Sequence, residues 1–299
     1  MLEMSDREKF LFDLQGFLHV EGILSPDEVK AMNDAVNAHA GDEYAEGFFS
    51  KSDNGYGGGM DGEYDARTFE GMLTWEKPHC LPFRELIAHP RVIPYLNTLF
   101  GRGWRMDQLP FVRIARKGTG GHGLHGATNV TYDGAQMYRY TNGEIRTGMA
   151  VFQFQLSDIN PGDGGITVIP GSHKSNFHCP DDILLNSNDE QAVRNVGGKA
   201  GDLVIFLEAT IHGALPWTAD HHRRSLFYRY VPKYVDFHAE YLETKLPDWV
   251  DELTEVQKAV VQPPYVYERP LLEDDGVSLV YPAEEPEPQN RPPRKLPRG

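Results

Sequence analysis

Two segments of the chain carry histidines in settings that suit metal binding. Residues 121–127 form a glycine-rich stretch that contains His122 and His125, which we expect to lie in a turn after a strand. Residues 201–213 predict a strand that ends at His212. A neutral imidazole is a natural iron ligand, although a lone histidine is more often a surface or structural residue. The two segments are therefore candidates for a two-histidine metal site, provided that the fold brings them together.

The elements that would position these histidines are short strands preceded by helices. Residues 24–28 carry a serine cap, a proline and a glutamate that mark a helix start, and residues 90–100 predict a second helix. Short β-type runs separated by glycine and proline follow at residues 111–115, 149–156, 165–169, 203–207 and 225–231. This order predicts an all-β core with flanking helices, arranged as a cupin-like jelly roll, or double-stranded β-helix.

The composition predicts one large domain and a separate tail. We expect residues 1–262 to form a single jelly-roll domain with N-terminal helices. From residue 263 onward, proline and acidic residues accumulate before a basic end, and this composition predicts a largely extended tail for residues 263–299.

The charge and the sequence pattern limit the classes of partner. The formal charge of −15 argues against nucleic-acid or anionic-membrane binding. No apolar stretch approaches a membrane span, and the N-terminal residues lack the pattern of a signal peptide, so a cytoplasmic location is expected. The only two cysteines, Cys80 and Cys179, are too few for a disulfide framework or a cysteine zinc site. The oligomeric state is left open.

An ordered set of motifs resembles the phytanoyl-CoA dioxygenase family. The set consists of Asn160-Pro161-Gly162-Asp163-Gly164-Gly165, Val168-Ile169-Pro170-Gly171-Ser172-His173-Lys174, Gly201-Asp202 and His212-Gly213. The resemblance runs from about residue 111 to residue 232. It implies an enzyme that uses iron(II) and 2-oxoglutarate to oxidise an unactivated C–H bond of a small molecule.

The resemblance also implies roles for individual residues. His125 and His212 would be the metal ligands and catalytic centre, and Arg223 would bind the far carboxylate of 2-oxoglutarate. A guanidinium suits that task because it grips a carboxylate through two parallel hydrogen bonds. Arg224 is the alternative, and only one of the two should point inward because neighbouring strand residues face opposite ways. His122 competes with His125, although the resemblance favours His125.

Three further histidines receive no role in the metal site. We expect His173 to be structural, and we expect His221 and His222 to be solvated in a polar turn.

One position departs from the family pattern. The family usually has His-x-Asp or His-x-Glu as its first ligands, whereas this chain has His125-Gly126-Ala127, and Ala127 cannot bind metal. In one interpretation the vacant position accepts chloride, as in related iron halogenases whose motif reads His-x-Ala or His-x-Gly. The reaction would then be halogenation.

Two other interpretations of Ala127 stay open. Glu208 could substitute for the missing carboxylate, because Glu208, Thr210 and His212 would share one face of a regular strand, and hydroxylation would follow. Alternatively, the protein is a non-catalytic jelly-roll binding module. The sequence does not distinguish these three alternatives, and it does not identify the substrate.

Overall fold

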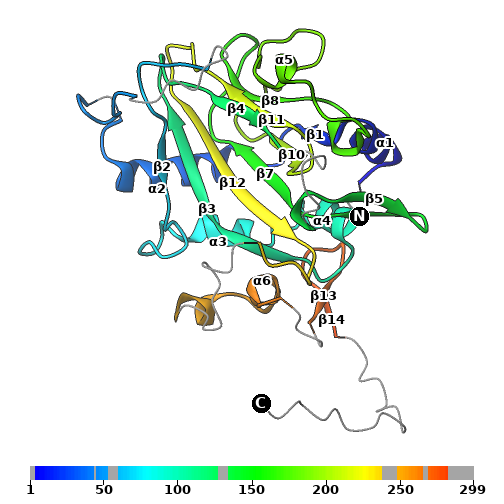
Figure 1. The fold of residues 1–299 in the computed structure, drawn as a ribbon. Helices are drawn as coiled ribbons and strands as arrows, with labels where there is room; N and C mark the ends of the chain where they lie inside the picture. The colour runs from blue at the N-terminus through cyan, green and yellow to red at the C-terminus, as the bar shows by residue number, and fades with distance from the viewer. Residues whose placement is uncertain are drawn as a thin grey trace, which may run out of the picture.

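Two antiparallel β-sheets form the centre of the protein in a computed structural model, which describes residues 4–43, 45–52, 60–126, 134–237, 248–264 and 269–281. The larger sheet has six strands in the order β1-β10-β7-β12-β3-β2, and the smaller has four in the order β4-β11-β8-β9 (Figure 1). The strands of these sheets are β1 (Phe17–Val20), β2 (Arg67–Phe69), β3 (Arg105–Ala115), β4 (His122–His125), β7 (Ala150–Gln155), β8 (Gly165–Val168), β9 (Arg194–Asn195), β10 (Leu203–Leu207), β11 (His212–Leu215) and β12 (Arg223–Val231).

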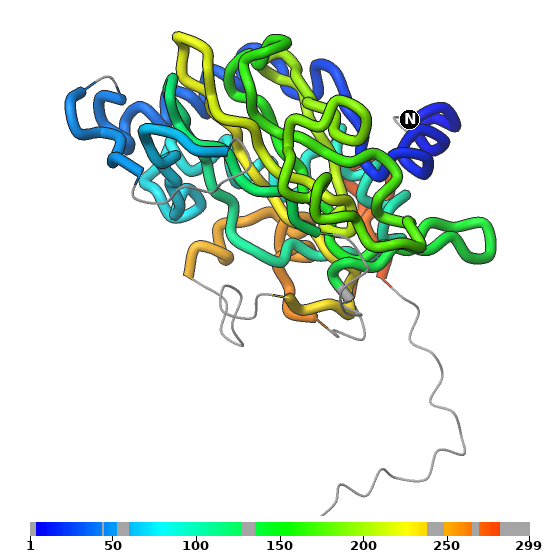
Figure 2. The backbone as a smooth tube through the Cα atoms, turned by 45° about the horizontal axis from the view of Figure 1, so that its top comes forward, coloured from blue at the N-terminus to red at the C-terminus, as the bar shows by residue number. Residues whose placement is uncertain are grey.

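Helices and two small hairpins surround the sheets. The helices are α1 (Asp6–Gln15), α2 (Pro26–Ala40), α3 (Leu81–Leu86), α4 (Ile93–Phe100), α5 (Asp181–Leu184) and α6 (Glu255–Val261), with short 3-10 turns η1 (Gly134–Gln136), η2 (Ser172–Lys174) and η3 (Asp248–Glu252). The hairpins are β5 (Tyr138–Thr141) with β6 (Glu144–Thr147), which projects from the body (Figure 2), and β13 (Leu271–Leu272) with β14 (Leu279–Val280). No helix in the described ranges is both long and apolar enough to cross a membrane.

The chain passes repeatedly from one sheet to the other. Strands β3, β7, β10 and β12 belong to the six-stranded sheet, whereas β4, β8 and β11, which follow the first three of them, belong to the four-stranded sheet. Each sheet is therefore assembled from strands that are distant in sequence. This arrangement places residues that are far apart in the sequence side by side, such as His125 and His212, which are 87 positions apart.

Alternation along the large sheet separates an outer apolar face from an inner face. On β7, the outward Phe152 and Phe154 are fully buried in the main hydrophobic core together with side chains of α2, α3 and α4. The intervening Val151 and Gln153 face a cavity between the sheets. This follows from the two-residue period of a strand, and the helices provide the cover that the outer face requires.

The local helix and strand signals in the sequence are largely confirmed. Ser25 caps α2 and forms a reciprocal capping box with Glu28, and Val29, Met32 and Val36 on one face of the helix are buried. All five predicted strands occur within one or two residues of their expected bounds, except that β3 begins earlier, at Arg105. The second predicted helix is also present as α4, which begins at Ile93.

The prediction of an extended tail after residue 262 is wrong for residues 269–281. Arg269 is buried and donates hydrogen bonds to the carbonyls of Ala259 and Gln262, both at 2.8 Å. Asn97 of α4 donates to the Leu272 carbonyl at 2.9 Å, and the Leu272 side chain belongs to the main core. These polar and apolar contacts fold the segment onto the domain, while residues 282–299 lie outside the described residues.

His173 joins the η2 turn to helix α1. Its Nε2 donates a hydrogen bond to the Asp13 carbonyl at 3.0 Å, and its ring packs edge-on against Tyr138. Burial, aided by the charge of Lys174, lowers the pKa of His173 from 6.5 to about 4. The ring is therefore neutral in the folded protein at neutral pH, which agrees with the structural role expected for it.

We expect His173 to make the protein less stable in mild acid. Because its pKa is lower in the folded than in the unfolded state, the unfolded chain binds the proton more readily. This residue's contribution is complete above about pH 6.5 and is lost as the pH falls toward about 4. Between about pH 7.5 and about pH 5 the free energy of unfolding should fall by about 2 kcal/mol on account of His173.

Urea denaturation of His173→Gln at these two pH values tests this expectation. Glutamine retains a donor for the Asp13 carbonyl but does not titrate, so the variant should lose this part of the pH dependence. His178→Gln, at an exposed histidine, is the matched control and should behave as the parent protein does. An unchanged pH dependence in His173→Gln would contradict the assignment.

Candidate functional site

A cavity of about 130 Å³ lies between the two sheets. The inner face of the large sheet contributes Phe111, Arg113, Gln153, Arg223, Phe227 and Arg229, and the small sheet contributes His122, His125, Ile166 and residues 212–215. Glu208 and Trp217 come from the turns that follow β10 and β11. The candidate residues His125, His212, Glu208 and Arg223 therefore line one cavity.

His125 and His212 lie opposite each other on neighbouring strands of the small sheet. They are register partners of β4 and β11, and their ring centroids are 4.2 Å apart. The His125 Nδ1 lies 2.9 Å from the Gly123 carbonyl, and the His212 Nδ1 lies 2.7 Å from the Thr210 carbonyl. A carbonyl only accepts, so each Nδ1 donates, and the neutral form of each ring keeps its lone pair on Nε2.

This arrangement fits a metal centre. Histidine ligands of metals usually donate their second N–H to a carbonyl or carboxylate, which fixes the orientation of the ring. Burial lowers the pKa of His212 to about 4, so its ring stays neutral and able to bind a cation at neutral pH. The segment that carries His125 is a short strand, β4, and not the turn that the glycine-rich sequence suggested.

Glu208 lies beside His212, but not through the regular strand that the sequence predicted. Strand β10 ends at Leu207, residues 208–211 form a turn, and His212 begins β11 in the other sheet. The Thr210 hydroxyl points away from the cavity to the Gly16 carbonyl. The turn nevertheless brings Glu208 Oε2 to 4.0 Å from His212 Nε2, while its Oε1 lies 3.7 Å from Arg229 Nε.

The remaining residues near the two histidines do not complete a preformed metal cluster. His122 also lines the cavity, with its ring centroid 4.6 Å from that of His125. Its Nδ1 lies 3.1 Å from the Gly123 carbonyl. Within the part of the chain that the structure describes, no three His, Cys, Asp or Glu side chains already converge on one point. Ala127 lies outside the described residues.

Arg223 points into the cavity and Arg224 points out of it. Arg224 turns toward α2, where its guanidinium pairs with Glu43 at 2.7 Å and bonds the side-chain oxygens of Asn33 and Asn37. Arg223 is 7% exposed and donates to the Ser225 hydroxyl at 3.1 Å. Because consecutive strand residues face opposite ways, one arginine is structural and the other is presented to the cavity.

Arg223 is a buried cation without an acidic partner among the described side chains. Burial, with the nearby charge of Arg113, lowers its pKa to about 10, so it still carries its charge at neutral pH. An unpaired buried charge is costly in free energy, and a bound anion would offset that cost. The site is thus suited to a carboxylate such as that of 2-oxoglutarate.

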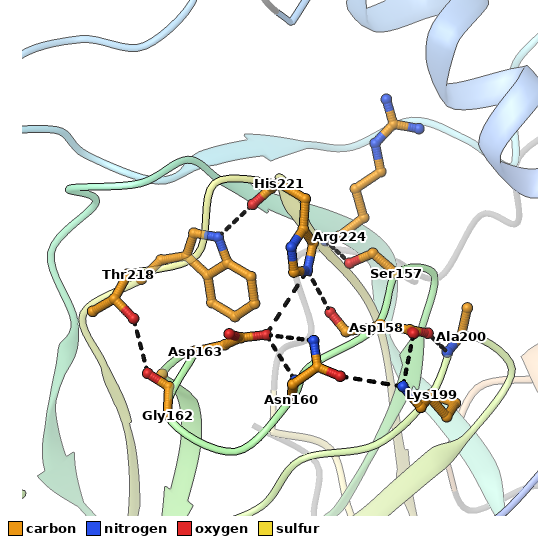
Figure 3. Close-up of polar contacts among 12 residues, drawn as sticks. Ser157, Asp158, Asn160, Gly162, Asp163, Lys199, Ala200, Thr218, His221 and Arg224 are labelled. Carbon is orange, nitrogen blue, oxygen red and sulfur yellow. Dashed lines mark hydrogen bonds and ion pairs between the residues drawn. The ribbon is translucent and has the colours of Figure 1, made fainter.

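A polar network holds the turn that leads into Arg223 (Figure 3). The Trp217 indole donates to the His221 carbonyl at 2.7 Å, and the His221 ring bonds the Asp158 carbonyl at 2.9 Å. The Thr218 hydroxyl donates to the Gly162 carbonyl at 2.8 Å. A Cβ at Gly164 would lie 2.0 Å from the Pro216 carbonyl oxygen, so only glycine allows this approach. The loop after β7 therefore fixes Trp217 and the start of β12.

The expectation that His221 and His222 are both solvated is wrong for His222. The His222 side chain is 8% exposed, and its Nδ1 lies 3.1 Å from Glu43 Oε1. His221 remains partly exposed, with the contacts described above. Glu43 and Phe49, which follow α2, pack against His222, and the local polar sequence could not reveal these contacts.

Several cavity residues had no assigned role in the sequence, among them Arg113, Gln153, Trp217 and Arg229. The sequence nevertheless contains a signal for three of these four residues. Arg113, Gln153 and Arg229 each lie between two apolar or aromatic neighbours in their strands, at inner-facing positions where a polar side chain costs free energy unless it has a partner. Trp217 has no comparable signal, since its place depends on the turn after β11.

Comparison with protein families identifies the chain. A family model described as phytanoyl-CoA dioxygenase matches residues 12–225, well over half of the 299 residues. The chain belongs to the phytanoyl-CoA dioxygenase family. This family consists of iron(II)- and 2-oxoglutarate-dependent oxygenases. The match also includes most of the N-terminal helical region, which the motifs alone supported more weakly. A comparison with curated proteins finds no match.

Solved structures share the fold of this family member. HygX from Streptomyces hygroscopicus, with nickel, 2-oxoglutarate and hygromycin B bound, is 18% identical, and the alignment covers 78% of this chain and 90% of HygX with a TM-score of 0.63. EctD from S. alaskensis is 20% identical over 77% of each chain, with a TM-score of 0.55. The epimerase SnoN from nogalamycin biosynthesis is 18% identical, covering 77% and 83% of the chains, with a TM-score of 0.53.

The contrast between the two adjacent arginines predicts opposite effects on stability. Arg224→Gln breaks a buried ion pair and should lower the free energy of unfolding by about 3 kcal/mol. Arg223→Gln removes a buried charge that has no acidic partner in the described structure, so the metal-free protein should be as stable as the parent or more stable. Chemical denaturation of both metal-free variants measures the difference. Equal destabilisation would mean that Arg223 also has a structural partner.

Proposed function

We propose that this protein is an iron(II)- and 2-oxoglutarate-dependent oxygenase that oxidises a C–H bond of a small molecule, with hydroxylation as the expected outcome. His125, His212 and Glu208 would hold the iron, and Arg223 would hold the far carboxylate of 2-oxoglutarate. The observation that carries the proposal is a shared cavity: two imidazoles whose Nδ1 atoms are held by carbonyls lie in it together with a buried arginine that has no acidic partner among the described residues.

Glu208 is our candidate for the carboxylate that Ala127 cannot provide. Its Oε2 lies 4.0 Å from His212 Nε2, so a small rotation of the Glu208 side chain would bring the carboxylate to an ion that His212 holds. Two histidines and one carboxylate are the ligand set that leaves positions open on non-haem iron. This proximity favours hydroxylation over halogenation, in which chloride would take the vacant position.

The protein's own groups have defined roles in this proposal. Iron(II), 2-oxoglutarate and dioxygen together supply the oxidising chemistry, in which 2-oxoglutarate becomes succinate and carbon dioxide. The carbonyls of Gly123 and Thr210 orient the two imidazoles, and Arg223 fixes the direction in which 2-oxoglutarate lies. The polar network around Trp217 and His221 keeps Arg223 at that end of the cavity.

We also infer that the two sheets are those of a double-stranded β-helix. Between β3 and β12 the chain crosses repeatedly from one sheet to the other, and both sheets line the cavity. The shared fold with HygX, whose structure contains nickel and 2-oxoglutarate, supports this inference. The bound hygromycin B in HygX, and nogalamycin RO in complex with SnoN, support a small-molecule substrate for this chain as well.

The absorption spectrum of the metal-free protein under anaerobic conditions is the first test. Iron(II) and 2-oxoglutarate together should produce a visible charge-transfer band, and the band should not respond to chloride. Succinate formation in air with iron(II) and ascorbate should follow. A band that depends on chloride would favour halogenation, and no band would favour a non-catalytic binding module.

The role of Glu208 is tested by Glu208→Gln, which keeps the shape of the side chain and removes its charge. Loss of a ligand should weaken iron(II) binding by more than about tenfold, because even indirect partners of metal ligands contribute on that scale. Equilibrium dialysis with iron(II) measures the affinity. Glu190→Gln, at an exposed glutamate, should bind as the parent protein does. Unaltered iron affinity in Glu208→Gln would exclude Glu208 as a ligand.

Ala127→Asp provides a complementary test. If position 127 faces the metal as the family pattern implies, a new carboxylate should restore iron binding to Glu208→Gln. Failure to restore binding in the double variant would count against a place for Ala127 beside the metal. The same dialysis measurement gives the answer.

A further inference from the structure

Arg229 lies at the same end of the cavity as Glu208 and has unused hydrogen-bonding capacity. Its side chain, 28% exposed, lines the cavity from β12, and one terminal nitrogen donates to the Gln108 side-chain oxygen. Its Nε lies 3.7 Å from Glu208 Oε1, beyond hydrogen-bond distance, and finds no hydrogen-bond acceptor in the described structure. If Glu208 turns to the metal, the remaining close partner of Arg229 is the neutral Gln108.

Two stacked aromatic rings lie beside Arg229. The rings of Phe111 and Phe227 stack with centroids 4.8 Å apart, and both side chains line the cavity. The Arg229 guanidinium carbon lies 5.3 Å from the centroid of Phe111. An apolar surface therefore leads directly to a cationic group, and the pair forms a subsite for a molecule with an apolar body and an anionic end.

The charges of the cavity favour an additional anion. Glu208 is the sole acidic side chain among the described lining residues, against Arg113, Arg223 and Arg229, although the whole chain carries −15. Iron(II) and the 2-oxoglutarate dianion neutralise each other, and Glu208 offsets one arginine. Of Arg223 and Arg229, one therefore lacks a compensating negative charge, even when Arg113 is left out of the count. A half-buried cation of this kind gains stability from an anionic ligand.

Arg229 and Arg223 have different neighbours along the cavity. They are six residues apart on β12, which corresponds to roughly 20 Å between Cα atoms. Arg223 pairs in register with Ala115 and contacts the neighbourhood of Gly165, whereas Arg229 pairs with Val151 near Glu208. When Arg223 holds 2-oxoglutarate, Arg229 is available to a different ligand.

We propose that Arg229 binds a carboxylate of the substrate, whose apolar body lies along Phe111 and Phe227. The inference rests on the proposed function, because it assigns 2-oxoglutarate to Arg223 and Glu208 to the metal. The substrate class is thus an organic carboxylate with an apolar or aromatic portion. The planar guanidinium provides the two parallel donors that recognise such a group.

Calorimetric titration of the full chain loaded with zinc(II) and 2-oxoglutarate tests this assignment without turnover. The probes are 3-phenylpropanoate and its neutral amide, 3-phenylpropanamide. We expect the carboxylate to bind at least tenfold more tightly than the amide. Arg229→Gln should reduce this preference to less than about threefold, while Arg194→Gln, at an exposed arginine outside the cavity, should leave it unchanged.

The affinity for 2-oxoglutarate, measured in the same proteins, separates this inference from the proposed function. Arg223→Gln should weaken 2-oxoglutarate binding at least tenfold, whereas Arg229→Gln should change it less than threefold. If the parent protein does not bind 2-oxoglutarate, the proposed function fails and the inference fails with it. If 2-oxoglutarate binds normally but the carboxylate does not bind, binds no better than the amide, or keeps its preference in Arg229→Gln, the inference alone is overturned.

Discussion

Apolar packing of the helices against the outer face of the six-stranded sheet stabilises the fold on which the cavity depends. Side chains such as Phe152, Phe154 and Leu226 are fully buried there. Removal of this area from water is the main favourable contribution to folding. The inner face of the same strands can then carry Arg223 and Gln153, whose burial costs free energy. Stability and chemistry are thus separated onto opposite faces of the same strands.

Strand register is the second constraint on the site. His125 and His212 meet because β4 pairs with β11, and a slip of one residue would turn an imidazole away from the cavity. Glycines permit the close approach of the neighbouring segments. A Cβ at Gly213 would lie 2.6 Å from the His122 carbonyl oxygen, and one at Gly126 would lie 2.7 Å from that of Glu208. A larger residue at Gly126 or Gly213 would therefore displace the strands that carry the two histidines.

The two ends of the cavity carry different charged groups. Arg223 lies at one end, and the two histidines lie with Glu208 and Arg229 toward the other. The stacked rings of Phe111 and Phe227 lie between these groups. A ligand that carries charge at one end would therefore bind in one orientation, because each end of the cavity presents different chemistry.

The sequence by itself determined the family, the helix starts, the strands and the residue types of the site, because capping, alternation and ordered motifs are local properties. It could not determine that residues 269–281 fold onto α4, or that Glu43 and Phe49 pack against His222, because these contacts join distant segments. It also placed Glu208 on a regular strand with His212, whereas a turn brings the two together. Only the tertiary structure decided which arginine faces the cavity and that Arg229 adjoins Glu208, since both depend on how non-local strands pair.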